Sequence, residues 1–255
     1  MLNYSLEKYV PYSYQKICKG TEGHDLPINV YLPTEENVNS KKSVVCIHGG
    51  AWTSDLKAGS TWNGSWMKHT AAVFASLGYI ALEITHRSIT ETDINGILSD
   101  IEAAFKEVKT EIMPRHKAEK LYAIGDSAGG HLALMSAIFK DETLRPEKVV
   151  ACNPVSDLTD PKWQLYSTAE NDRRNASPIY RNDKTETEIF ILHGDADKTV
   201  LPSCSEKLQE HFDSFGIHSR LEILPDATHA FILYGYRTPI EKVNEYTEKA
   251  VNFFN

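Results

Sequence analysis

The sequence predicts an α/β fold in which a largely parallel β-sheet is covered by helices on both faces. Two observations point to it. Short apolar runs alternate with helix-length stretches along the 255 residues, and a Gly-Asp-Ser-Ala-Gly turn joins one apolar run to a helix-like stretch. Such alternation is typical of parallel sheets, because parallel strands need a crossover connection. At this length we expect one domain spanning residues 1–255.

Six apolar runs have the length and composition of buried strands. An earlier segment, residues 28–32, alternates polar and apolar side chains and indicates an antiparallel strand at the sheet edge. The six runs are residues 43–47, 79–84, 121–124, 149–152, 189–192 and 221–224.

Helices are predicted where apolar residues recur at helical spacing between these runs. Two other stretches are predicted to be irregular connections. Residues 53–65 are rich in Gly, Ser and Trp, and residues 156–187 are polar and are a candidate for a small insertion over the sheet. The predicted helices are residues 66–77, 94–112, 131–139, 204–215 and 240–254.

The composition is that of an ordinary soluble globular protein. A net charge of −8 argues against a nucleic-acid partner, which would need a basic face. The longest apolar run, residues 71–82, is too short to span a bilayer, so we expect no membrane association. The four cysteines are widely spaced, and the amino terminus lacks the features of a signal peptide. We expect a reduced, cytoplasmic protein, although a secreted protein whose signal had been removed would look the same.

The segment Gly125-Asp126-Ser127-Ala128-Gly129 matches G-x-S-x-G, the turn that presents a nucleophilic serine between a strand and a helix. A side chain at position 125 or 129 would crowd the neighbouring backbone, and the serine must adopt a strained conformation. The amides that open the following helix would point at the reacting oxygen. The alternative is a chance match on an ordinary strand-helix turn.

A serine hydroxyl needs a general base, and the base needs an acid to orient it. Asp197 follows the run 189–192, and His229 follows the run 221–224. Both are therefore expected at the carboxyl ends of strands, the same edge of the sheet as Ser127. Asp195 competes with Asp197 for the role of the acid.

In this order of serine, acid and histidine the chain resembles the α/β-hydrolase superfamily, in particular its esterase and lipase branch, from about Ile28 onward. In that family H-G-x-x-D-x-x-V carries the acid, and here it reads from His193 to Val200, which selects Asp197. The resemblance implies a mostly parallel, twisted sheet of about eight strands with helices on both faces. It also implies a small or absent cap.

The family's H-G-G-G loop supplies amides to an oxyanion hole, and here it reads His48-Gly49-Gly50-Ala51-Trp52. Ala51 replaces the third glycine, which leaves its backbone amide available. The spelling HGG-x-W is seen in feruloyl and acetylxylan esterase-like proteins and in the kynurenine formamidase group. The resemblance implies an oxyanion hole made by the amides of Gly50, Ala51 and Ala128.

The implied mechanism is acyl transfer to Ser127, with His229 as base and Asp197 as its orienting acid. No metal or cofactor is required. The leading interpretation is a serine carboxylesterase acting on small-molecule esters with small acyl groups, with acetyl or feruloyl esters of saccharides as candidates. The alternatives are a serine peptidase or amidase, including an arylformamidase, and a ligand-binding relative without catalysis.

Several other side chains near these motifs are given an expected role. Trp52 either lines the substrate pocket or anchors its loop on the core, whereas Trp62 and Trp66 are expected mainly as anchors. The histidines at positions 48, 131 and 193 are expected to make structural hydrogen bonds. Asp126 is expected to be a tolerated variable position whose charge could tune the local field.

Overall fold

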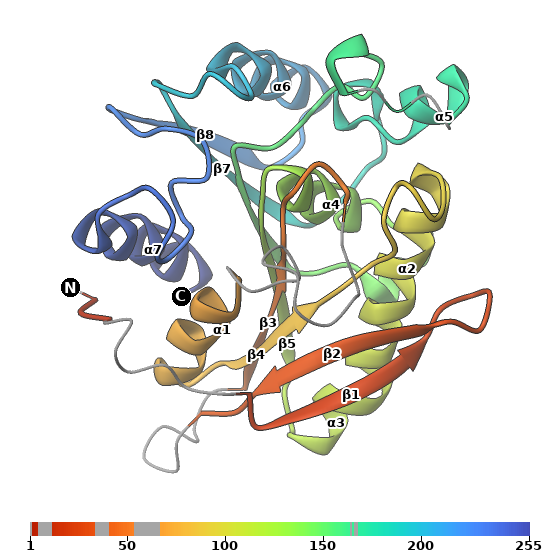
Figure 1. Ribbon diagram of the computed structural model, residues 1–255, viewed down its shortest axis with the longest axis vertical. Coiled ribbons are helices and arrows are strands. Elements are labelled where there is room, and N and C mark those ends of the chain that lie inside the picture. Colours follow the sequence, from red (N-terminus) through yellow and green to blue (C-terminus); the bar gives the residue numbers. More distant parts are fainter. Residues whose placement is uncertain (1, 5–11, 34–40, 54–66, 164, 166–167) are drawn as a thin grey trace.

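Within the described residues, eight strands form one sheet in the order β1-β2-β4-β3-β5-β6-β7-β8 (Figure 1). The computed structural model describes residues 2–4, 12–33, 41–53, 67–163, 165 and 168–255. The strands are β1 (Tyr14–Lys19), β2 (Asp25–Tyr31), β3 (Lys42–Ile47), β4 (Ile80–Ile84), β5 (Lys120–Asp126), β6 (Lys148–Cys152), β7 (Glu188–Gly194) and β8 (Ser219–Leu224).

Strand β2 runs antiparallel to both β1 and β4, and every later pairing in the sheet is parallel. The parallel part explains the continuous apolar runs, because both faces of these strands are buried under helices. The α/β-hydrolase fold class predicted from the sequence is thereby confirmed. The antiparallel edge expected at residues 28–32 is β2, and β1 extends it by a further strand that the sequence pattern did not reveal.

Helices cover both faces of the sheet (Figure 1). Side chains of β3 alternate between the two layers: Val45 and Ile47 belong to the apolar cluster that includes α2, α4 and α6, whereas Val44 and Cys46 belong to the cluster that includes α1 and α7. The helices are α1 (Met67–Ser76), α2 (Ile94–Glu107), α3 (Met113–Arg115), α4 (Ala128–Ser136), α5 (Glu170–Asn175), α6 (Pro202–Phe215) and α7 (Ile240–Phe254).

All six predicted strands form, with ends within two residues of those expected. Two helix predictions need correction. The helix expected over 94–112 is α-helical only to Glu107 and continues as a π-helical turn, Val108–Ile112, into α3. Pro114 accounts for this, because its ring would clash with the carbonyl four residues earlier in a regular α-helix. The helix expected over 131–139 begins earlier, at Ala128, and ends at Ser136.

The two predicted irregular connections differ in how much can be described. Residues 156–187 hold α5 and two 3₁₀ turns, η5 (Pro161–Trp163) and η6 (Pro178–Tyr180), and a third such turn, η4 (Glu142–Leu144), precedes β6. Of the connection 53–65 only Thr53 lies within the described residues. Across the described ranges, no helix has both the length and the apolar character needed to cross a membrane.

Candidate active site

Ser127 stands between β5 and α4 in a conformation that non-glycine residues seldom adopt, with φ 55° and ψ −118°. The flanking glycines make this turn possible. A Cβ on Gly125 would lie 2.9 Å from the Gly130 amide nitrogen, and one on Gly129 would lie 2.5 Å from the His48 carbonyl oxygen. The expected crowding at positions 125 and 129 is therefore confirmed, and it shows that β3, β5 and α4 meet in close backbone contact.

Three loops at the carboxyl edge of the sheet bring Ser127, His229 and Asp197 together. His229 Nε2 lies 3.0 Å from Ser127 Oγ, and His229 Nδ1 lies 2.7 Å from Asp197 Oδ2. Because an ionised carboxylate only accepts, Nδ1 carries the proton and Nε2 is free to accept from the serine hydroxyl. This tautomer is the one that a general base for Ser127 requires.

Asp197 is held rigidly as a buried carboxylate. Its Oδ1 accepts the backbone amides of Thr199 at 2.7 Å and Val200 at 3.0 Å, and its Oδ2 lies 3.5 Å from His193 Nε2. Burial raises the pKa of Asp197, but polar contacts with His193 and His229 and the Thr199 amide outweigh it and hold the pKa well below its usual range. Asp197 is therefore ionised wherever His229 titrates.

Asp195 occupies a different place. Its Oδ1 accepts the backbone amide of Asp226 at 2.7 Å, which ties the loop after β7 to the turn after β8. His229 Nδ1 donates its hydrogen bond to Asp197 instead. The geometry thus favours the acid that the H-G-x-x-D-x-x-V register selects.

The pKa of His229 is raised above its ordinary value of 6.5. Burial lowers this pKa, and the positive charge of Lys162 lowers it as well. The hydrogen bond that His229 donates to Asp197 and the negative charges of Asp126 and Asp197 raise the pKa, and together they outweigh the lowering effects. The site therefore favours the imidazolium, the form that His229 would adopt after taking a proton from Ser127.

The predicted oxyanion loop lies against the nucleophile turn. A Cβ on Gly49 would be 2.7 Å from the Asp126 carbonyl oxygen and 3.1 Å from Ser127 Cβ. Gly50, Ala51 and Trp52 all have positive φ, at 103°, 52° and 58°, and the Thr53 amide closes the turn onto the Gly50 carbonyl at 2.9 Å. The amide of Ala128, the first residue of α4, has no carbonyl within its own helix to bond with. The role of these amides as an oxyanion hole stays a prediction.

Residues 28–158, more than half of the chain, match the sequence model of the BD-FAE family. The chain belongs to the BD-FAE family. A comparison with curated protein sequences returns no match.

Solved structures of an esterase from the Planctomycetes species Thermogutta terrifontis share the fold. The propionate-bound form superposes with a TM-score of 0.79 at 21% identity, covering 96% of this chain and 93% of that one. The form phosphonylated by sarin gives a TM-score of 0.78 at 21% identity, covering 98% and 96%. The form phosphorylated by paraoxon gives 0.77 at 21% identity, covering 99% and 96%.

In this BD-FAE protein Trp52 is fully buried, and its indole nitrogen donates to His131 Nδ1 at 3.1 Å. His131 Nε2 in turn donates to the Ala176 carbonyl at 2.7 Å. These contacts favour Trp52 as the anchor of its loop, and the pocket-lining role stays a prediction. Trp62 and Trp66 lie outside the described residues.

The other two histidines make structural hydrogen bonds, as expected. His48 Nδ1 donates to the Gly49 carbonyl at 2.8 Å and so shapes the oxyanion loop. His193 Nε2 donates to the Val200 carbonyl at 2.9 Å, and Ser205 donates to its Nδ1 at 2.7 Å. His193 thereby also fixes the loop that carries Asp197.

Sequence reasoning missed the turn η5. Trp163 packs edge-on against Trp52 with ring centroids 6.0 Å apart, and the Lys162 ammonium donates to the Thr199 carbonyl. The turn therefore connects the oxyanion loop to the loop that carries Asp197. Pro161 was the signal that a turn occurs here, but a pattern of apolar and polar residues cannot indicate which loops it contacts.

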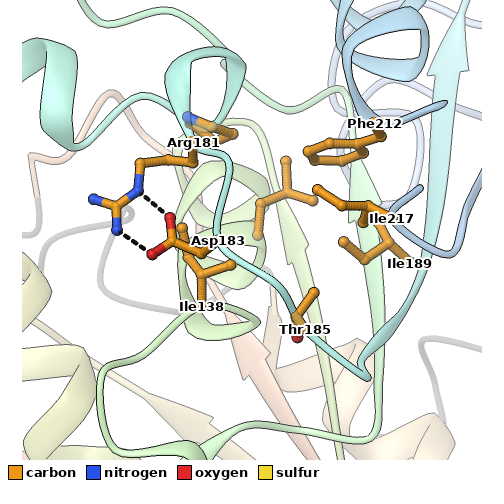
Figure 2. A pocket seen from close by; sticks show the side chains of 9 residues that line it. Ile138, Arg181, Asp183, Thr185, Ile189, Phe212 and Ile217 are labelled. Carbon is orange, nitrogen blue, oxygen red and sulfur yellow. Dashed lines mark hydrogen bonds and ion pairs between the residues drawn. The ribbon is translucent and has the colours of Figure 1, made fainter. Parts of the chain in front are cut away.

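Figure 2 shows a pocket formed by α4, α6, η6 and β7. Phe212, Ile217 and Ile189 line one side of it, and Arg181 pairs with Asp183 at its other side through contacts of 2.7 and 3.0 Å. None of the candidate catalytic residues lines this pocket. Among the residues that the structure describes, no group of three or more histidine, cysteine or acidic side chains could hold a metal ion.

Proposed function

We propose that this protein is a serine carboxylesterase that hydrolyses small acyl esters, with Ser127 as nucleophile, His229 as general base and Asp197 as orienting acid. One observation carries the proposal. An unbroken path of hydrogen bonds runs from Asp197 through His229 to Ser127, with separations of 2.7 and 3.0 Å. The strained backbone at Ser127 supports it, since such strain concentrates at functional sites.

In the first step Ser127 Oγ attacks the ester carbonyl while its proton passes to His229 Nε2. The amides of Gly50, Ala51 and Ala128 stabilise the oxyanion, each contributing about 3 kcal/mol to the transition state. The imidazolium then protonates the leaving alcohol and an acyl-enzyme remains. Water, deprotonated by the same histidine, attacks the acyl-enzyme, and the imidazolium returns the proton to Ser127 Oγ as the acid leaves.

Two findings support short acyl groups. The Thermogutta terrifontis esterase has been solved with propionate and with butyrate bound, and its fold covers most of this chain. The described part of the connection 156–187 holds only the short helical segments η5, α5 and η6. We therefore place acetyl esters of saccharides first among the candidate substrates and feruloyl esters of saccharides second, with a small-molecule ester as the sole partner required.

The test is hydrolysis of p-nitrophenyl esters from acetate to octanoate by the wild type, Ser127→Ala and Ser156→Ala. Ser156 is a buried serine at the same edge of the sheet and donates to the Cys204 carbonyl, so it is a matched control. We expect turnover that falls with acyl length, is abolished in Ser127→Ala and persists in Ser156→Ala. Paraoxon should add one diethylphosphoryl group, located at Ser127 by peptide mass spectrometry.

Two outcomes would contradict the proposal. Faster turnover of aryl formamides or amides than of any ester would make the protein an amidase. Folded protein that neither hydrolyses esters nor reacts with paraoxon would favour the hypothesis of a ligand-binding protein without catalysis.

A further inference from the structure

Asp126 is a buried carboxyl group that the mechanism above does not use. It is the last residue of β5, directly before Ser127, and only 2% of its surface is exposed. Aspartate is rarely buried to this degree without a specific reason. The position was expected to be a tolerated variable one whose charge could tune the local field, and its burial next to Ser127 favours the second part of that expectation.

The carboxylate of Asp126 faces inward, between the oxyanion loop and the loop after β6. Its Oδ2 is 3.3 Å from the position that a Cβ on Gly49 would occupy. Its Oδ1 accepts a long hydrogen bond, 3.4 Å, from Asn153 Nδ2, and Asn153 Oδ1 accepts the Gly194 amide at 3.3 Å. Asn153, with φ 43°, thereby links Asp126 to the end of the strand that leads to Asp197.

Asp126 directly precedes Ser127, whose Oγ is 3.0 Å from His229 Nε2, and it is paired in the sheet with Cys152. The titratable groups whose charges act on Asp126 are His229, Asp197 and His193, and the charge of Asp126 acts on Cys152. Burial raises the pKa of Asp126 to about 6, against the lowering effects of His229, Asn153 and His193. The effect on His229 is reciprocal, because the negative charge of Asp126 raises the pKa of that imidazole. Each of the two groups therefore stabilises the charged form of the other.

We propose that Asp126 is a positioning residue that acts through His229, stabilising the imidazolium formed when Ser127 gives up its proton. Asp197 holds Nδ1 by a hydrogen bond and so fixes the ring, whereas Asp126 contributes charge from the β5 side. Since the same charge lies beside the oxyanion loop, it also opposes the oxyanion. Asp126 therefore affects the pH at which His229 titrates more than it affects the maximal rate. This inference rests on the proposed function.

The test compares the pH dependence of kcat/KM in the wild type with three variants that each remove one charge. Asp126→Asn keeps a polar side chain for Asn153, and we expect its acid limb to move to lower pH by about one unit. Lys162→Gln removes a positive charge that lowers the pKa of His229 and should move the limb to higher pH. Asp195→Asn removes a negative charge whose carboxylate is bonded to the Asp226 amide, and should shift the limb less than Asp126→Asn. An unshifted Asp126→Asn profile overturns the inference.

A second measurement does not depend on turnover. The imidazole of His229 is titrated by NMR in Ser127→Ala and in Ser127→Ala with Asp126→Asn, and a lower midpoint in the double variant supports the inference. An equal midpoint overturns it. If the enzyme hydrolyses esters but the titration of His229 does not shift, only the role of Asp126 is refuted. If the titration shifts but the wild type has no esterase activity, only the proposed function is refuted. If Asp126→Asn does not fold, Asp126→Ser is titrated in the same way.

Discussion

Gly129→Ala is expected to separate the nucleophile from the oxyanion loop. The new Cβ would lie 2.5 Å from the His48 carbonyl oxygen, and nearer still to that of Ile47, where an ordinary contact begins at 3.4 Å. The backbone must therefore open by about 0.9 Å or more. Overpacking of this kind costs about 1–3 kcal/mol of stability, and a misplacement of about 1 Å at the reacting centre costs on the order of 100-fold in rate.

The assay is kcat/KM for p-nitrophenyl acetate together with the thermal midpoint, measured beside Gly96→Ala. Gly96 is also in a helix, but there the close atoms all belong to the side chain of Thr92, whose Oγ1 can turn away while its Cβ, at 2.9 Å, must shift slightly. The control tests crowding at a helical glycine away from the nucleophile turn, and it should keep its activity even where its melting temperature falls. We expect Gly129→Ala to remain folded with a lowered midpoint and to lose at least about 100-fold in kcat/KM. Wild-type activity in folded Gly129→Ala would refute the argument that this close approach aligns the two loops.

Three further predictions concern the catalytic residues themselves. Ser127→Ala and Ser127→Gly should both lack turnover. The glycine variant should be the more stable of the two by about 1 kcal/mol, because φ 55° strains any residue with a Cβ. Equal melting temperatures of the two variants would show that the turn stores no strain. Asp197→Asn should reduce kcat/KM by about 10³–10⁴-fold, as loss of an orienting acid does, whereas Asp195→Asn should cost far less; the reverse ranking would reassign the acid. The base must be neutral to accept a proton, and the pKa of His229 is raised above 6.5, so activity should fall on acidification with a midpoint above pH 6.5. A profile that is flat from pH 5 to 8, under conditions in which chemistry limits the rate, would exclude a histidine base.

Much of the fold and the location of the candidate site could be predicted from the sequence, because both depend on local patterns. Buried strands have continuous apolar runs, and the parallel order places the residues that follow β5, β7 and β8 at one edge. The short spacing within Gly125–Gly129 reflects backbone contacts, so the glycines could be interpreted before the structure was known. The hydrogen-bonded order Ser127, His229, Asp197 is what that reasoning expected.

What the sequence could not show depends on contacts between distant segments. Asp126 looks like an interchangeable position within a motif, and only the surrounding loops reveal that it is buried and that its charge acts on His229. In the sequence of strand β1 apolar and polar residues alternate only weakly, and one face of the strand is exposed. Its pairing with β2 was therefore not predicted. The π-helical turn before α3 depends on how one proline is accommodated, which periodicity does not record.

Helix α4, which follows Ser127, and the turn η5 differ in how well they should tolerate amino-acid substitutions. All nine residues of α4 are buried, so nearly every substitution there alters packing on one of its sides. Pro161 and Lys162 are exposed, and η5 contacts the site through side chains rather than through the sheet. Exposure leaves η5 freer to change than α4, but substitution of Lys162 or Trp163 would reach the site through the loops that carry Asp197 and Trp52. Pro161, which makes neither contact, is the position of this turn where change should cost least.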